Sequence, residues 1–150
     1  MVAAGKVPTV DLGLENAGVE YTPKGVETNE FLQTSAKHIF AAGDVLGEHM
    51  LTHAALLESR VVAHNIFNKD KAAPSYRAVP RITYVTPEIG SVGLGEDDCI
   101  KRDLTYHKAI APLNIIGRSN IANMRDGFVK VITDKKGVLI GATVVSPHAG

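Results

Sequence analysis

The run FVKVITDKKGVLIGATVV, residues 128–145, decides the fold of the second half of this chain. Two stretches rich in β-branched residues, 128–133 and 138–145, flank the polar loop Asp134–Gly137. A short polar loop closed by glycine between two such runs is typical of a β-hairpin. We therefore expect residues 128–133 to pair antiparallel with residues 138–145.

Similar patterns extend outward from this hairpin toward the N-terminus. Residues 81–85, 89–93 and 106–110 are further expected strands, and residues 96–104 form an expected short helix with acidic residues in its first turn. From about Pro80 onward the chain is therefore expected to be α+β with an antiparallel sheet. Strands 89–94 and 138–145 are apolar along almost their whole length, which indicates burial on both faces and a partner surface over one of them.

The first half of the chain is rich in turns and ends in one helix. Pro23–Gly25 fits a type I turn, with a short strand after it at 26–28. Residues 39–42 form an apolar run that predicts a short buried strand. Residues 51–68 are expected to be helical, with Glu58 and Arg60 outside the apolar stripe. That stripe consists of Leu51, Ala54, Ala55, Val61, Val62, Ala63 and Ile66.

Composition excludes several classes of function. Sixteen basic residues balance sixteen acidic ones among 150, which gives no electrostatic reason to expect nucleic acid or an anionic membrane as partner. No apolar run is long enough for a membrane span. The single cysteine, Cys99, excludes an internal disulfide and a zinc site built from several thiolates. We expect Cys99 to be a half-buried structural residue in a protein of the reducing cytoplasm.

Two neighbouring features could carry chemistry. Gly43-Asp44 follows the apolar run 39–42, and a carboxylate at the end of a strand can accept a hydrogen bond from a sugar-alcohol hydroxyl. The start of the helix at Leu51-Thr52-His53 would present N–H groups to an anionic ligand. Both have a plainer interpretation, in which Asp44 caps the following turn and Thr52 caps the helix.

Other catalytic signatures are missing from the sequence. Among the six histidines only His49 and His53 stand at i, i+4, and they have few acidic neighbours, so no metal is predicted and a metal-binding protein that uses this pair is the third alternative. There is no GxGxxG, no phosphate-binding P-loop and no GxSxG.

The ordered set of segments, taken together, resembles the family that contains dihydrolipoyl dehydrogenase, glutathione reductase and mercuric reductase, the class I pyridine nucleotide-disulfide oxidoreductases. Residues 3–8 resemble A-x-G-R-x-P, 12–19 resemble L-G-L-E-x-A-G-V, and 34–45 resemble the second flavin motif, T-S-x-x-x-I-Y-A-x-G-D-V. Residues 50–55 resemble M-L-A-H-x-A, and 79–94 resemble the opening of the family's dimerisation domain. The resemblance covers almost the whole chain.

The resemblance implies a role for each matching residue. Asp44, preceded by Gly43, would accept hydrogen bonds from the ribityl hydroxyls of FAD, and Gly5 would lie beside the nicotinamide nucleotide. Lys6 stands where the family usually has arginine, and arginine and lysine are not interchangeable. The residues that would line the flavin are Met50, Leu51, Thr52 and His53.

The same resemblance predicts the organisation of the chain. Residues 1–73 would be the end of the NAD(P) domain and the C-terminal part of the FAD-binding domain, with Val2–Gly5 as the end of a buried strand. Residues 74–150 would be a C-terminally truncated dimerisation domain. The family's glycine-rich flavin segment, its C-x-x-x-x-C pair and its H-P-x-x-x-E segment are not in the sequence. We therefore assign no catalytic residue, and we expect the chain alone to be inactive.

The parent enzyme would pass electrons between NAD(P)H, FAD and a disulfide or dithiol substrate, as a homodimer. The M-L-x-H-x-A segment favours dihydrolipoyl dehydrogenase. Mercuric reductase is the alternative within the family, and a stand-alone dimerisation module is the alternative outside catalysis. Neither the substrate nor the choice between NAD and NADP is determined by these residues.

Overall fold

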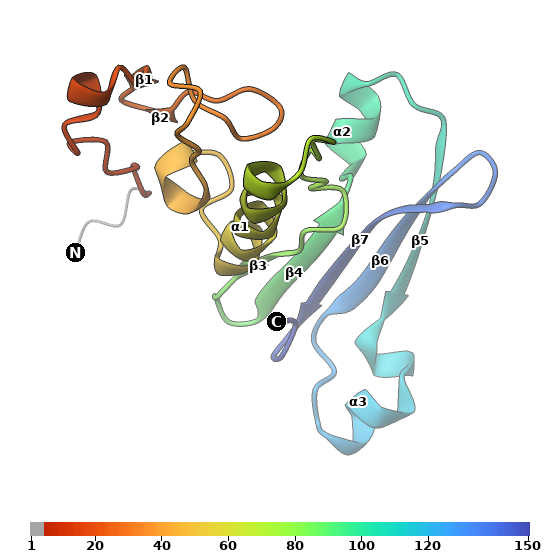
Figure 1. The fold of residues 1–150 in the computed structure, drawn as a ribbon. Coiled ribbons are helices and arrows are strands. Elements are labelled where there is room, and N and C mark those ends of the chain that lie inside the picture. Colours follow the sequence, from red (N-terminus) through yellow and green to blue (C-terminus); the bar gives the residue numbers. More distant parts are fainter. Residues whose placement is uncertain (1–4) are drawn as a thin grey trace. The chain divides into compact units, whose positions relative to one another are not determined.

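A computed structural model describes residues 5–150 of the chain, so residues 2–4 of the strand end expected at Val2–Gly5 lie outside the described residues. The chain divides into two compact units, Met1–Tyr76 and Arg77–Gly150. Figure 1 shows the two units in sequence colours, the first in red to green and the second in green to blue. The fold is mixed α and β, as the sequence predicts.

The first unit contains little regular structure before its helix. Its elements are the 3-10 helix η1 (Leu14–Ala17), the strands β1 (Tyr21–Thr22) and β2 (Gly25–Val26), the 3-10 helix η2 (Gly43–Leu46) and the helix α1 (Thr52–Phe67). β1 and β2 pair antiparallel around the turn predicted at Pro23-Lys24. The second strand is therefore earlier and shorter than the stretch 26–28 expected from the sequence.

The prediction of a buried strand at 39–42 is wrong. This stretch is half-buried. Among the described residues, its β-pairing is a single isolated antiparallel bridge between Phe40 and Gln33. A strand needs a neighbouring backbone along its length, and here the pairing is limited to this one bridge, with the hydrogen bonds Thr34 N–H to Ile39 C=O and Ala41 N–H to Leu32 C=O beside it. Apolar composition alone did not reveal that lack.

Helix α1 forms within one residue of its expected bounds, but the side it buries differs from the apolar stripe. Ala54, Glu58 and Asn65 are its buried residues. Ala63 and Ile66 of the expected stripe are exposed, and Glu58, which the pattern places outside that stripe, is only 1% exposed. The buried side of α1 is therefore partly polar.

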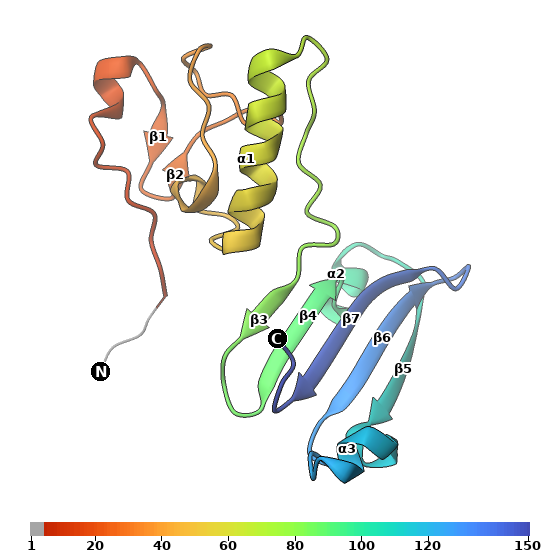
Figure 2. The same ribbon diagram turned by 60° about the horizontal axis from the view of Figure 1, so that its bottom comes forward.

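The second unit is a five-stranded antiparallel sheet in the order β3-β4-β7-β6-β5, shown in Figure 2. Phe128 pairs with Val145 and Val131 with Ala142, so the hairpin predicted from 128–145 is confirmed, with a register shift at Ile132/Thr133. The strands are β3 (Arg81–Thr83), β4 (Glu88–Gly93), β5 (Tyr106–Pro112), β6 (Phe128–Asp134) and β7 (Leu139–Ser146).

The helix α2 (Glu96–Lys101) contacts one face of this sheet through Glu96 and is shorter than the helix expected at 96–104. Glu96 in its first turn accepts hydrogen bonds from Lys108 of β5 at 2.6 Å and from Lys130 of β6 at 3.0 Å. These two bonds, the one to Lys108 first, lower the pKa of the Glu96 carboxyl. Cys99 of α2 is fully buried, not half-buried as expected, and is a free cysteine.

The opposite face of the sheet carries small apolar side chains. Since side chains alternate along a strand, Val131 faces away from Lys130 and α2. The register places Ala142 directly opposite Val131, and Val92 opposite Ala142. All three are half-buried.

The remaining elements, the 3-10 helix η3 (Leu113–Ile115) and the short helix α3 (Gly117–Ile121), were not expected from the sequence. Among the described residues, no helix is long and apolar enough to cross a membrane.

Two glycines of the second unit provide a test of its packing. A Cβ at Gly141 of β7 would lie 1.9 Å from the carbonyl oxygen of Leu94, which is backbone and cannot rotate away. We expect Gly141→Ala to destabilise the second unit by about 2 kcal/mol or more, as overpacking does. Gly117→Ala is the control, because a Cβ there meets nothing within 4 Å. Urea unfolding of both variants checks this, and equal midpoints would contradict it.

Candidate functional site

The Gly43-Asp44 turn is built on backbone that favours glycine. Gly43 opens η2 with φ +83°, and a Cβ there would lie 3.3 Å from Cβ of Ala55 on α1. Asp44 follows as the second residue of η2 and is exposed. Ala42 occupies the N-cap position of η2, so the plainer interpretation of Asp44 as the cap of this turn is wrong.

Lys6 connects the two parts of the candidate site. Its Nζ atom donates a hydrogen bond to the carbonyl oxygen of Met50 at 2.5 Å and lies 3.8 Å from Oδ2 of Asp44. Both charged side chains are about 60% exposed, at 61% and 62%. Gly5, next to Lys6, has φ +114° and is exposed. The structure thus brings Gly5, Asp44 and Met50 into one neighbourhood.

The start of α1 lies directly after Met50. Leu51 is its N-cap residue and has no side-chain capping hydrogen bond, so the alternative that Thr52 caps the helix is wrong. Met50 and Leu51 are half-buried, and Thr52 and His53 are exposed. The first N–H groups of an α-helix have no intrahelical acceptor and carry partial positive charge. This end of α1 therefore suits an anionic or carbonyl group.

Two residues that the sequence did not identify, Glu58 and Tyr76, hold the backbone of the Gly43-Asp44 turn through hydrogen bonds. Glu58 on α1 accepts hydrogen bonds from the backbone N–H of Gly43 at 2.6 Å and from the Tyr76 hydroxyl at 2.9 Å. Burial, followed by the hydrogen bond to Glu58 and by the charges of Glu58 and Glu48, raises the pKa of Tyr76. Tyr76 thus stays a proton donor to the carboxylate.

The i, i+4 pair of histidines does not form a metal site in the structure. The His49 ring packs against the Tyr76 ring, with centroids 4.1 Å apart. Within residues 5–150, no group of three or more His, Cys, Asp or Glu side chains is arranged to hold a metal ion.

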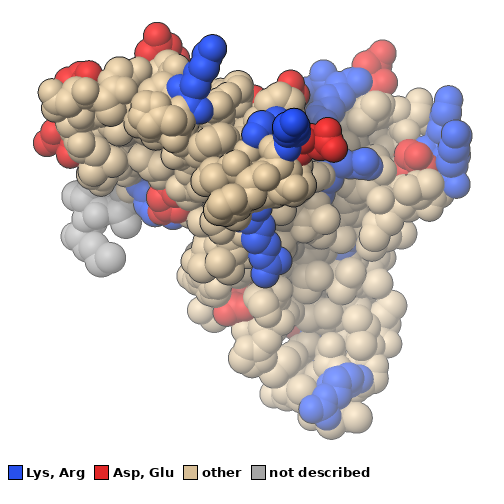
Figure 3. Space-filling view, in the orientation of Figure 1, with Lys and Arg blue, Asp and Glu red and all other residues tan. Residues whose placement is uncertain are grey.

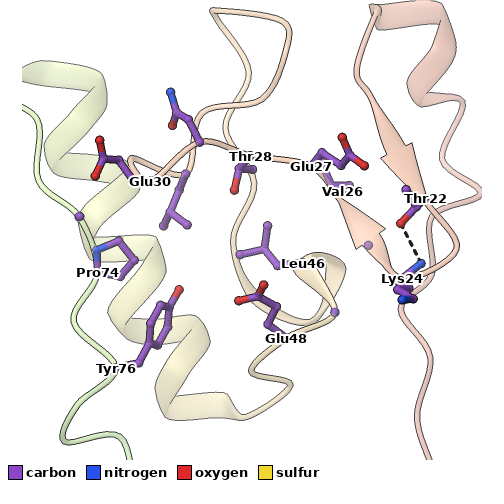
Figure 4. A pocket seen from close by; sticks show the side chains of 15 residues that line it. Thr22, Lys24, Val26, Glu27, Thr28, Glu30, Leu46, Glu48, Pro74 and Tyr76 are labelled. Atoms are coloured by element: carbon purple, nitrogen blue, oxygen red, sulfur yellow. Dashed lines mark hydrogen bonds between the residues drawn. The ribbon is translucent and has the colours of Figure 1, made fainter. Parts of the chain in front are cut away.

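A hollow of about 720 Å³ opens elsewhere on the first unit (Figure 4). Its lining combines apolar side chains such as Val26 and Leu46 with the carboxylates Glu27, Glu30 and Glu48. None of the predicted site residues lines it. The hollow is therefore distinct from the Gly43-Asp44 turn, and its size alone assigns no ligand to it.

The Tyr76 hydroxyl gives a pH-dependent test. Because its pKa is raised above the value of about 10 in the unfolded chain, the folded protein keeps this proton at alkaline pH while the unfolded chain loses it. The stabilisation that Tyr76 provides should be complete below pH 10 and decline above it. Urea unfolding from about pH 8 to 11 should show a steeper loss in the wild type than in Tyr76→Phe. Parallel curves would contradict the assignment.

Comparison with known proteins places both units in one family. The family model "Pyridine nucleotide-disulphide oxidoreductase" matches residues 1–59, and its "dimerisation domain" model matches residues 79–150. The dihydrolipoyl dehydrogenase 3 of Haloarcula marismortui is 38% identical over 99% of this chain and 32% of its own length. The mercuric reductase of Staphylococcus aureus is 36% identical over 100% of this chain and 28% of its own length. The chain thus spans about a third of the length of the curated relatives it matches.

Solved structures agree with the sequence comparison. LpdA from Mycobacterium tuberculosis superposes with a TM-score of 0.84 at 29% identity, over 95% of this chain and 32% of that protein. The HOCl-induced flavoprotein disulfide reductase RclA from Escherichia coli superposes with a TM-score of 0.85 at 28% identity, over 96% of this chain and 34% of that protein. The two family models and these relatives show that the chain belongs to the class I pyridine nucleotide-disulfide oxidoreductases.

Proposed function

We propose that this chain supplies one wall of the FAD site and the dimerisation unit of an NAD(P)-linked flavoprotein disulfide oxidoreductase. The observation that carries the proposal is the junction of the Gly43-Asp44 turn with the N-terminus of α1, linked through Lys6. A carboxylate and a helix N-terminus side by side suit a ligand that has both hydroxyl donors and an electron-rich edge. FAD has both.

The roles that we propose for the individual residues are those that the family resemblance implies, and this geometry is compatible with them. Asp44 accepts hydrogen bonds from the ribityl hydroxyls, because its carboxylate is exposed and its ion pair with Lys6 is long, at 3.8 Å. Backbone N–H groups at the start of α1 stabilise negative charge on the pyrimidine edge of the flavin, with Met50, Leu51, Thr52 and His53 along it. Gly5 leaves room for the nicotinamide nucleotide. The bound FAD supplies the electron transfer between the nicotinamide and a disulfide or dithiol substrate.

We further propose that residues 1–73 complete the nucleotide and flavin domains and that residues 74–150 form the dimerisation domain. A dihydrolipoyl dehydrogenase-like substrate is favoured by the relatives with that name. The mercuric reductase relative supports the alternative within the family. Neither nucleic acid nor membrane is a proposed partner, and the free, buried Cys99 suits the reducing cytoplasm. No residue of the chain is proposed as catalytic.

A chimera tests the flavin wall directly. The segment of the Geobacillus stearothermophilus dihydrolipoyl dehydrogenase that this chain matches would be replaced by this chain, which is 35% identical to it. We expect the chimera to bind FAD and Asp44→Asn to weaken FAD binding about tenfold or more, since a hydrogen bond to a charged acceptor is lost. Asp11→Asn, at another exposed carboxylate, is the control.

The separate chain should bind FAD weakly or not at all, because it matches only about a third of such a protein. Titration followed by flavin absorbance and fluorescence measures all four proteins. A chimera that binds no FAD in this titration, or equal FAD affinity in Asp44→Asn and the control, would contradict the proposed wall and favour a dimerisation module without a flavin role.

Apolar surface on the second unit supports its proposed role in dimerisation. In Figure 3 the surface around α3 and the adjoining ends of β5 and β6 is uncharged apart from a basic patch at α3. Ile115 and Ile121 in this region are 70% and 79% exposed. The sheet face with Val92, Val131 and Ala142 lies opposite α2 and is half-buried within the unit. A partner surface would cover these side chains, and interfaces of this kind bury roughly 2,000 Å² or more.

Light scattering at several concentrations tests this surface. We expect the chain to self-associate, and the double variant Val129→Thr with Val131→Thr to associate about tenfold more weakly, since each hydroxyl would be buried without a partner. Val138→Thr, at a 56% exposed position next to the hairpin loop, is the control. If the chain stays monomeric at high concentration, the proposal that this surface of the second unit is a dimer interface is wrong.

A further inference from the structure

Glu58 is a carboxylate buried in a unit that otherwise uses carboxylates on its surface. It is 1% exposed, and both of its oxygens have a partner. Oε2 accepts from the backbone N–H of Gly43 at 2.6 Å, and Oε1 accepts from the Tyr76 hydroxyl at 2.9 Å. Burying a carboxylate is costly unless its oxygens are well hydrogen-bonded. The geometry therefore points to a specific task for this side chain.

The group that Glu58 holds is the residue directly before Asp44. Gly43 is buried and has φ +83°, a conformation that the backbone does not favour for other residues. Among residues 5–150, the Asp44 side chain contacts the exposed Lys6 in an ion pair of 3.8 Å, which does not fix a turn. The short, buried hydrogen bond from the Gly43 N–H to Glu58 therefore fixes the position of the backbone from which the Asp44 side chain extends.

Glu58 is itself held by the segment that returns along α1. Asn65, two helical turns further along the same side, accepts from Ala72 N–H at 2.8 Å and donates to the Ala72 carbonyl at 2.9 Å. This pairing fixes the start of the return segment, and Tyr76 at its end donates to Glu58. Burial and Glu58 raise the pKa of the Tyr76 hydroxyl, so it remains a donor well above neutral pH.

We propose that Glu58 is a positioning residue of the flavin site, which fixes the Gly43-Asp44 turn through the Gly43 N–H, with Tyr76 fixing Glu58 in turn. The ligand named here rests on the proposed function, whereas the positioning of the turn does not. Glu58 acts through Gly43 and Asp44 and need not touch the flavin.

Amide hydrogen exchange of the ¹⁵N-labelled 150-residue chain tests the positioning without any flavin. Glu58→Met keeps the volume but removes the acceptor, so exchange of the Gly43 amide should accelerate about tenfold or more, as expected for a buried donor left without a partner. Glu58→Gln keeps an acceptor oxygen and should restore most of the protection. Ser59→Ala, at the exposed neighbouring position, should leave it unchanged.

The Ala72 amide, held by Asn65 in the same unit, distinguishes local from general loosening. Faster exchange at Gly43 alone supports the proposal. If the amide exchange rates of Gly43 and Ala72 rise equally in Glu58→Met, Glu58 only stabilises the whole unit. If the exchange rate of Gly43 does not change, Glu58 does not hold the turn. Either result overturns the proposal.

The same substitutions in the Geobacillus chimera connect the turn to the ligand. With FAD as the probe, Glu58→Met should weaken binding about tenfold and change the visible circular dichroism of the flavin, while Glu58→Gln should resemble the unsubstituted chimera. Equal FAD affinity in all three would overturn the role in the flavin site even if Gly43 exchanges faster. A chimera without FAD binding would instead count against the proposed function, since the exchange result stands by itself.

Discussion

Every buried backbone N–H and C=O group needs a hydrogen-bond partner, and the two units of this chain meet that requirement differently. In the second unit the partners are other strands, in a continuous antiparallel ladder from β3 to β5. Among the described residues of the first unit, the paired strands β1 and β2 form a hairpin and are very short. There, helix α1 and several turns bond backbone to backbone, and side chains supply further partners: Asn29 accepts from the N–H groups of Phe31 and Gln33. Glu58 and Asn65 do the same for Gly43 and Ala72.

This difference explains where the candidate site lies. A sheet ladder fixes backbone in a regular form and leaves little freedom to expose a carboxylate next to a helix N-terminus. A loop whose backbone is held by side chains can take an irregular path and still be well defined. The path from Gly43 to Leu51 has that character, with a left-handed glycine at Gly43 and another at Gly47, where an added Cβ would lie 1.7 Å from the Lys24 carbonyl oxygen.

The same difference explains which parts of the structure the sequence predicts. The hairpin at 128–145 is readable because its partners are neighbours in sequence and its loop ends in glycine. The buried Glu58 is not readable in this way, because a glutamate within a helix is ordinarily solvent-exposed and apolar periodicity ignores it. The apolar run 39–42 was misassigned because its composition says nothing of a pairing partner. A signal for Glu58 did exist, since it stands on the same helical side as Ala54 and Asn65.

Lys6 shows how the site tolerates a departure from the family's pattern. An arginine could form two parallel hydrogen bonds to the Asp44 carboxylate and occupy it, whereas a lysine ammonium acts as a point charge. Here the ammonium makes its short contact with the Met50 carbonyl, at 2.5 Å, and stands 3.8 Å from Asp44. The carboxylate thus feels a positive charge without being saturated by it, and its oxygens remain able to accept from hydroxyl groups. The short contact of Lys6 is therefore with the backbone directly before α1, and Lys6 does not form a bidentate pair with the Asp44 carboxylate.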